Sequence, residues 1–241
     1  MKTKIPPCVD CAHCAFTAIC RDYLFQERLG VFVDSLQRKS PYKKGDIIFN
    51  PGEPVRHLIA LRSGFIKIYD ADDQLRGVML PGQLIGSEDM FQCRHQRRAV
   101  AATDVTVCLI DSARIYLLSQ VTTHANRHFL DMFSKAASEY QEMLTVMMQS
   151  TAQKKVSAFF ALMMTRNVNG GFQKNKLSLP LTQKELASLL GISPMTLRRV
   201  ITGLIKEKTI SITRDGILIL NKNSLADGTS EPESGTGHFD T

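Results

Sequence analysis

The fold of this chain is decided by residues 182–199, which read TQKELASLLGISPMTLRR. Thr182 followed three residues later by Glu185 is a capping-box pattern, which predicts that a helix begins here. Gly191 is typical of a helix end, because glycine readily adopts a left-handed backbone conformation. The dipeptide Ser193-Pro194 then predicts the start of a second helix. Two helices joined by so short a turn have the spacing of a helix-turn-helix motif.

Two short apolar runs follow the second helix and extend this motif. Residues 210–212 and 217–219 read as strands, and Asp215-Gly216 between them is a strong signal for a tight turn. The resulting hairpin is the wing of a winged helix-turn-helix domain, which we predict over residues 151–225. Residues 151–222 carry 12 Lys and Arg against 3 Asp and Glu, a net charge of +9, whereas the whole chain carries +7. This concentration of positive charge predicts a polyanionic partner.

The first residues of the second helix are the ones that reach base edges in the major groove of DNA. An arginine there can donate two hydrogen bonds to guanine, and a nearby threonine can hold a phosphate. A helical hairpin with surface arginines is the plainer alternative, but the caps, glycine, arginines and wing occur together in order. The predicted DNA-binding residues are Thr182, Met195, Thr196, Arg198 and Arg199, with Val200, Leu204 and Ile205 expected to face the core.

The middle of the chain has a different pattern. Short apolar runs between residues 42 and 111 are separated by Gly, Pro and Asp, which indicates a β-barrel or jelly roll. We therefore expect an α+β protein with a cysteine-rich arm over 1–20 and a β-roll sensor domain over 21–121 that opens with a helix over 21–39. The acidic tail 226–241 is expected to be disordered. Apolar runs are too short for a membrane span and the N-terminus lacks a secretory signal, so we expect a cytoplasmic protein.

A single long helix is predicted over residues 122–150. Apolar side chains recur along it at spacings of three and four, which is the heptad pattern of a coiled-coil seam. Two interpretations remain open, since the stripe can pack on the helix's own β-roll or against a second copy in a parallel dimer. The stripe consists of Leu130, Phe133, Ala137, Tyr140, Leu144 and Met147.

Four of the six cysteines, Cys8, Cys11, Cys14 and Cys20, fall within thirteen residues. In a cytosolic protein such a cluster is more typical of metal binding or redox chemistry than of structural disulfides. Iron–sulfur clusters and zinc both use short Cys-x2-Cys runs, and the absence of a second, distant pair mildly favours iron–sulfur. Cys108 lies on the last predicted strand, where alternation places it on the face opposite Val105, Val107 and Leu109, from which it can meet the arm; a small buried apolar residue is the alternative interpretation. Cys93 reads as an incidental loop residue.

At this point the chain resembles the CRP/FNR superfamily of transcription regulators, over about residues 11–221. Four stretches carry the resemblance: KGD at 44–46, RSG at 62–64, PGQLIG at 81–86 and LTQKELA at 181–187. The cysteines are most similar to those of the oxygen-responsive FNR type. That resemblance implies a [4Fe–4S] cluster held by Cys11, Cys14, Cys20 and Cys108. It also implies a homodimer on double-stranded DNA with a palindromic operator, and RNA polymerase as a partner.

Two departures from the family pattern change what we expect. Gly86-Ser87 and Arg97-Arg98 stand where cyclic-nucleotide-binding relatives have Gly-Glu and Arg-Ser or Arg-Thr, so cAMP is not expected as a ligand. Met195 stands where FNR-type recognition helices have glutamate, so the DNA half-site is expected to differ. A regulator whose cysteines act as a thiol–disulfide or zinc sensor is the alternative. An enzyme is not expected, because no nucleophile–base or paired-carboxylate motif stands out.

Overall fold

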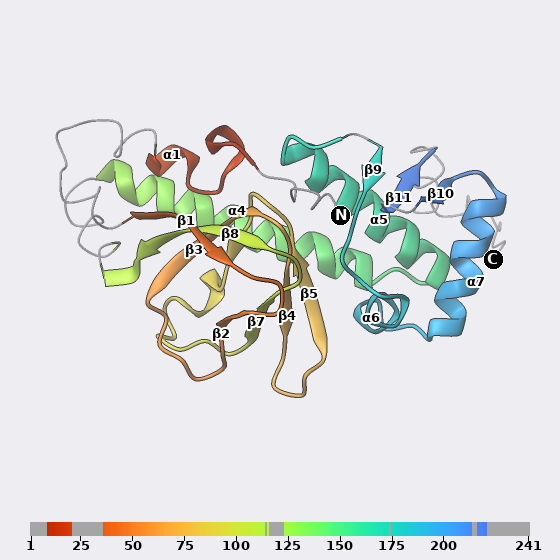
Figure 1. Cartoon of the computed structure of the whole chain (residues 1–241), viewed down its shortest axis with the longest axis horizontal. Helices are drawn as coiled ribbons and strands as arrows, with labels where there is room; N and C mark the ends of the chain where they lie inside the picture. Colours follow the sequence, from red (N-terminus) through yellow and green to blue (C-terminus); the bar gives the residue numbers. More distant parts are fainter. Residues whose placement is uncertain are drawn as a thin grey trace, which may run out of the picture.

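The computed structural model describes residues 9–20, 36–113, 115, 123–173, 175–213 and 216–220. A β-sandwich lies at one end and a small helical domain at the other, and one long helix runs along the sandwich toward that domain (Figure 1). Most of the predicted helix 21–39, the turn of the wing, the tail 226–241 and Cys8 lie outside the described residues. Within the described ranges, none of the helices combines the length and the apolar composition that crossing a membrane requires.

The sandwich confirms the predicted jelly-roll class. It consists of two four-stranded antiparallel sheets, with strand orders β1-β8-β3-β6 and β2-β7-β4-β5. The strands are β1 (Leu36–Tyr42), β2 (Ile47–Phe49), β3 (His57–Ser63), β4 (Ile66–Tyr69), β5 (Leu75–Met79), β6 (Leu84–Ile85), β7 (Arg98–Ala101) and β8 (Val105–Asp111). The predicted helix is wrong at residues 36–39, because this segment pairs with β8 as a strand.

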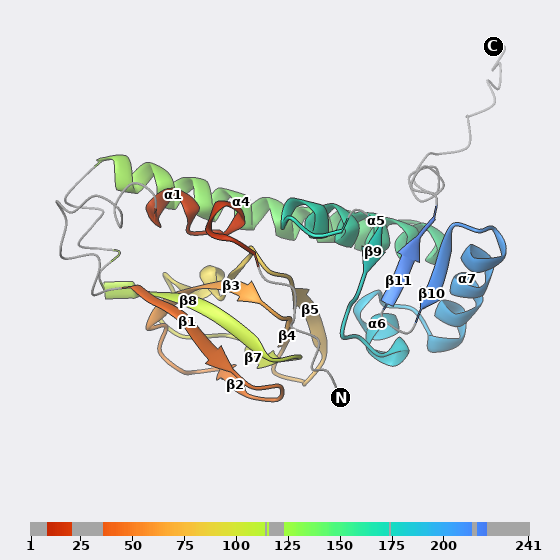
Figure 2. The same cartoon turned by 45° about the horizontal axis from the view of Figure 1, so that its top comes forward.

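Strand β8 has two apolar faces, and it separates two cores. Val105, Val107 and Leu109 point between the sheets, whereas Cys108 and Ile110 belong to a second cluster outside the sandwich. Alternation along a strand produces this division, so the predicted orientation of Cys108 is confirmed. The second cluster is closed by the arm and by helix α4 (Thr123–Met147), which lie over the same sheet in both views (Figures 1 and 2).

The helical domain follows α4 directly. Its elements are α5 (Ala152–Asn169), β9 (Lys176–Leu177), α6 (Gln183–Leu189), α7 (Pro194–Lys206), β10 (Ile210–Thr213) and β11 (Gly216–Ile219). Strands β10 and β11 form the predicted hairpin, and β9 adds a third strand beside β11. The two-residue strand β9 was not predicted, because it is too short to show an alternating pattern.

The predicted caps of α6 and α7 are both present. The Thr182 hydroxyl accepts a hydrogen bond from the Glu185 amide at 3.1 Å, and the Glu185 carboxylate accepts one from the Thr182 amide at 2.8 Å. Gly191 has a φ of +63°, so the chain reverses there without a side-chain clash. The Ser193 hydroxyl then caps α7 by accepting from the Thr196 amide at 3.1 Å.

Gly64, in the turn between β3 and β4, generates a stability prediction. Its φ is +79°, and a Cβ there would lie 2.2 Å from the carbonyl oxygen of Asp104. We expect Gly64→Ala to lower the free energy of unfolding by more than about 2 kcal/mol, because backbone strain and a backbone clash add. Gly77→Ala is the control, since nothing lies within 4 Å of a Cβ at that strand position. Equal urea midpoints for the two variants would contradict the prediction.

Candidate nucleic-acid interface and cysteine site

The predicted DNA-contacting residues lie at the N-terminal ends of α6 and α7. Met195, Arg198 and Arg199 are exposed on α7, and Met195 is 83% exposed despite being apolar. Thr182 is exposed at the N-cap of α6, and Thr196 is half-buried. The exposed side chains therefore occupy the part of the motif that enters the major groove in helix-turn-helix proteins.

The core-facing side of α7 differs in part from the prediction. Leu204 is buried and Val200 is half-buried, as expected. Ile205 is 41% exposed, so its predicted core position is wrong, and Leu197 and Ile201 are buried in its place. The buried positions are spaced by four and three residues, so they form one stripe on the helix. Ile205 lies outside that stripe.

The start of α7 is fixed by its cap, and its two arginines are unpaired within the described residues. Hydroxyls of Ser193 and Thr196 lie 2.8 Å apart, in addition to the cap between them. In the described part of the chain, neither Arg198 nor Arg199 forms an ion pair with a carboxylate. Their guanidinium groups therefore keep their hydrogen-bond donors available for phosphates or base edges.

The cysteine arm is docked on the sandwich by its first described residues. The Val9 amide donates to the Arg62 carbonyl at 2.8 Å, and the Arg62 guanidinium donates back to the Val9 carbonyl at 3.2 Å. Asp10 caps the short helix η1 (Cys11–His13) by accepting from the amides of Ala12 and His13. Asp10 was not among the predicted site residues, although an aspartate directly before a short turn is a common cap.

The arm brings its cysteines to the outer face of β8. Phe16 and Ile19 are fully buried in the same cluster as Cys108. Ile19 is the last residue of the short helix α1 (Thr17–Ile19). Cys14 and Cys20 are half-buried and pack against this same apolar cluster, whereas Cys11 is exposed. Three of the four predicted ligands thus share one cluster, although 88 residues of sequence separate Cys20 from Cys108.

The chemical state of the arm thiols follows from this burial. Burial, with a smaller contribution from the neighbouring Cys108 and Cys11 thiols, raises the pKa of the Cys14 thiol to about 11. Cys14 is therefore protonated at neutral pH when no metal is bound, and a bound metal would displace that proton.

The donor set can be compared with what an iron–sulfur group requires. Such groups are held by cysteine thiolates, and Cys14, Cys20 and Cys108 supply thiols from one cluster, with Cys11 exposed on the same arm. Among the described residues, no three His, Cys, Asp or Glu side chains converge as metal ligands. The four cysteines therefore match an iron–sulfur group in residue type, but the structure does not gather them as a ligand set. Cys93 is exposed in a separate loop, as predicted.

Helix α4 buries one face and exposes another. Phe129, Met132 and Ala136 are buried against the arm and sandwich. Four residues of the predicted seam are exposed, namely Leu130 (69%), Ala137, Tyr140 (40%) and Leu144 (60%). The other two are half-buried within the chain, because Phe133 packs against the cluster that contains Cys108 and Met147 packs against the core that includes the DNA-binding domain. Packing within the chain thus covers the stripe only in part.

Arg97 and Arg98 both form ion pairs within the chain. Arg97 donates to the Glu88 carboxylate at 3.1 Å. Arg98 donates to Asp73 at 2.6 Å, and its guanidinium lies 5.1 Å from the centre of the Tyr69 ring. Arg97 and Arg98, which stand where cyclic-nucleotide-binding relatives have Arg-Ser or Arg-Thr, therefore already have carboxylate partners.

Comparisons with known proteins agree with this architecture. Residues 39–120 match the cyclic nucleotide-binding domain, and residues 154–227 match the Crp-like helix-turn-helix domain. Electron transport regulator A of Shewanella oneidensis is 28% identical over 222 residues, covering 90% of this chain and 89% of the relative. The fumarate and nitrate reduction regulatory protein of Yersinia pestis is 25% identical, covering 93% and 92%. Transcriptional activator protein anr of Pseudomonas aeruginosa is 26% identical, covering 93% and 94%.

Solved structures support the same fold. FixK2 from Bradyrhizobium japonicum superposes with a TM-score of 0.70 at 19% identity, covering 80% of this chain and 98% of that one. A CooA mutant from Carboxydothermus hydrogenoformans gives a TM-score of 0.63 at 15% identity, covering 88% and 94%. The chain thus has both family domains in sequence order, and its relatives match it over nearly the whole length. The relatives named above are regulators rather than enzymes. The chain therefore belongs to the CRP/FNR family of DNA-binding transcription regulators.

Proposed function

We propose that this regulator senses oxygen or redox state through a [4Fe–4S] cluster held by Cys11, Cys14, Cys20 and Cys108, and that it controls anaerobic-type genes. The observation that carries the proposal is the apolar cluster shared by Cys14, Cys20 and Cys108. The similarity to the fumarate and nitrate reduction regulatory protein of Yersinia pestis, at 25% identity, is consistent with this proposal. A bound cluster would supply an oxygen-labile link between the arm and β8.

The arm and β8 are well situated to act on helix α4. Phe129, Met132 and Ala136 of α4 pack into the same cluster as Cys108 and the arm residue Phe16. Ligation by the arm thiols would hold Phe16 and Ile19 in place and so stabilise this packing of α4. Loss of ligation would free the arm and weaken that packing, which is a shift in population between two states of one helix.

The exposed seam gives the second half of the proposed mechanism. Two copies of α4 pairing along it would form a homodimer in the cytoplasm and present two recognition helices about 34 Å apart to a palindromic operator. RNA polymerase is the further partner that we propose. We propose no role for cAMP, because Arg97 and Arg98 are paired within the chain.

The ligand assignment predicts a pattern among cysteine variants. Protein purified without oxygen should contain iron and acid-labile sulfide, and Cys108→Ser should lose both because one thiolate is missing. Cys93→Ser is the control and should retain them. Full iron and sulfide content in Cys108→Ser would overturn the assignment and make Cys8 the fourth ligand. Zinc without sulfide, or an arm disulfide, would instead support the thiol–disulfide or zinc alternative.

The dimer seam predicts the effect of a charge at Ala137. In the dimer, Ala137→Glu would bury two like charges without partners, which costs several kcal/mol. We therefore expect this variant to sediment as a monomer. Ser138→Glu, which adds the same charge at an exposed position off the stripe, should remain dimeric. A dimeric Ala137→Glu protein would show that the copies associate elsewhere.

Arg199 and Arg198 are expected to differ in their DNA contacts. Arg199→Ala should weaken the free energy of binding to the preferred DNA site by about 1–3 kcal/mol, because a bidentate contact with guanine is lost. It should also relax the preference at one base pair. If Arg198 instead holds a phosphate, Arg198→Ala should weaken binding to all DNA sequences alike. It should also lower the slope of log affinity against log salt concentration by about 1. Selection of sites from random DNA with wild type and both variants measures these effects.

The same selection tests the exposed Met195, which has no hydrogen-bond acceptor to offer a base amine. The selected half-site is expected to depart from the FNR type beside the guanine. If Arg199→Ala retains every base preference of the wild type, the reading role of Arg199 is wrong.

A further inference from the structure

One ion pair joins the sensor sheet to the first helix of the DNA-binding motif. The Lys67 ammonium of β4 lies 2.5 Å from the Glu185 carboxylate of α6. The side chains are only 15% and 26% exposed, so solvent screens this pair less than it screens a surface pair. The two residues are 118 positions apart in the sequence, and no pattern in either segment predicted their contact.

The same carboxylate also closes the N-terminus of α6. One Glu185 oxygen accepts from Lys67, while the other accepts from the Thr182 amide at 2.8 Å and the Thr182 hydroxyl at 2.9 Å. A carboxylate has lone pairs for all three donors. The position of the α6 cap is therefore coupled to a side chain of the sensor sheet.

Apolar contacts also cross this boundary. Phe65 and Val78 of the sandwich belong to one core cluster with Phe159, Leu186 and Leu189 of the DNA-binding domain. The Lys67–Glu185 pair adds a directional, charged contact between β4 and α6 to this apolar packing.

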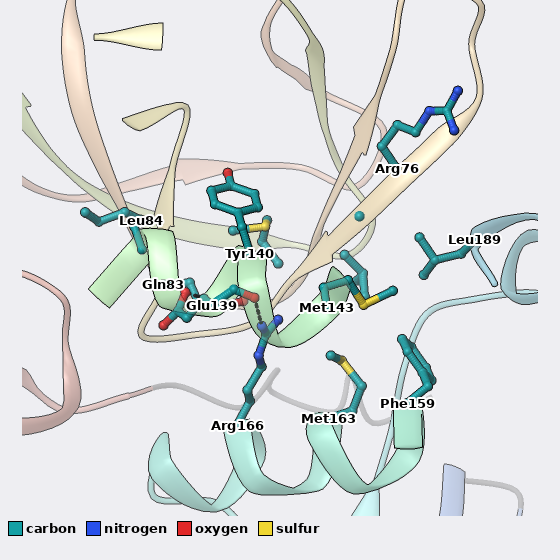
Figure 3. A pocket seen from close by; sticks show the side chains of 14 residues that line it. Arg76, Gln83, Leu84, Glu139, Tyr140, Met143, Phe159, Met163, Arg166 and Leu189 are labelled. Carbon is teal, nitrogen blue, oxygen red and sulfur yellow. Dashed lines mark hydrogen bonds between the residues drawn. The ribbon is translucent and has the colours of Figure 1, made fainter. Parts of the chain in front are cut away.

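A pocket lies beside this cluster, between β5, α4, α5 and α6, and part of its space is open to solvent. Figure 3 shows Leu189 of α6 on one side, facing Met143, Met163 and Phe159, with Arg166 bonded to Glu139 farther along. Leu189 is the residue of α6 that lines this pocket, and it is itself only 5% exposed.

The ion pair lies away from the predicted DNA-contacting residues of α7. Met195, Arg198 and Arg199 are exposed on α7, and Figure 1 shows α7 at the outer edge of the domain, beyond α6 from the sandwich. Thr182 at the N-cap of α6 is also a predicted DNA contact and bonds to Glu185, so variants of Lys67 leave both partners of that cap in place. Loss of the ion pair lets the motif sample more orientations, and that freedom must be lost again when DNA binds.

From this geometry we propose that Lys67 and Glu185 form an interdomain latch that positions the recognition helix for DNA. Both are positioning residues, since they act on α7 through α6 and its cap. The latch is independent of the proposed cysteine chemistry, because it needs only the DNA-binding activity of the family.

The test compares DNA affinity among charge-removing and charge-keeping variants of the full chain, purified without oxygen. The probe is a duplex selected from random DNA by the wild-type protein. Lys67→Met keeps the aliphatic stem and removes the charge, whereas Lys67→Arg keeps the charge. Glu185→Gln removes the charge but retains an oxygen for the capping box. Lys43→Met is the matched control, because it removes one exposed positive charge from the same sandwich.

We expect Lys67→Met and Glu185→Gln each to lose about fivefold or more in affinity, the lower end of typical coupling between sites. The double variant should lose no more than either single one, and Lys67→Arg and Lys43→Met should stay near wild type. Thermal unfolding should be unchanged for Lys67→Met, while small-angle scattering should show a broader distribution of domain separations. Unchanged or tighter DNA binding by Lys67→Met, or additive losses in the double variant, would overturn the latch.

Discussion

Burial of both faces of strand β8 is the constraint on which the rest of this structure depends. One face fills the space between the sheets through Val107, and the other carries Cys108 and Ile110 into the cluster beneath the arm and α4. A strand with two apolar faces cannot be left exposed on either, because the hydrophobic effect favours covering both. The arm and the long helix provide that cover. The cysteines of the arm therefore reach β8 through the packing that completes the sandwich.

Helix α4 turns this cover into a connection between domains. Its buried side contacts the arm and the sandwich, and its C-terminal half meets α5, where Arg166 donates to the Glu142 carboxylate at 3.2 Å. Leu130, Ala137, Tyr140 and Leu144 of its apolar seam remain exposed. Because α4 contacts both domains and carries this stripe, it is the element through which we propose that a change in one part reaches the others. The Lys67–Glu185 latch adds a second route, from the sensor sheet directly to α6.

The sandwich keeps a family fold with its own arrangement of charged groups. Residues 39–120 match the cyclic nucleotide-binding domain, and Arg97 and Arg98 pair with Glu88 and Asp73 of the same chain. Guanidinium groups that already have carboxylate partners are less available for a phosphate. Function in such a fold depends on the groups placed on it, and the groups to which we assign it in our proposal are the arm cysteines and the recognition helix.

The sequence by itself determined the parts whose signals are local. The caps at Thr182 and Ser193, the stop at Gly191 and the alternation along β8 each depend on residues within a few positions, where backbone geometry decides the outcome. Only the tertiary structure decided which residues meet over long distances. The burial of Ile201 in place of Ile205, the pairing of residues 36–39 with β8 and the Lys67–Glu185 contact all depend on how separate elements pack. The partial exposure of the α4 seam belongs to the same group, because a heptad stripe does not reveal which surface covers it.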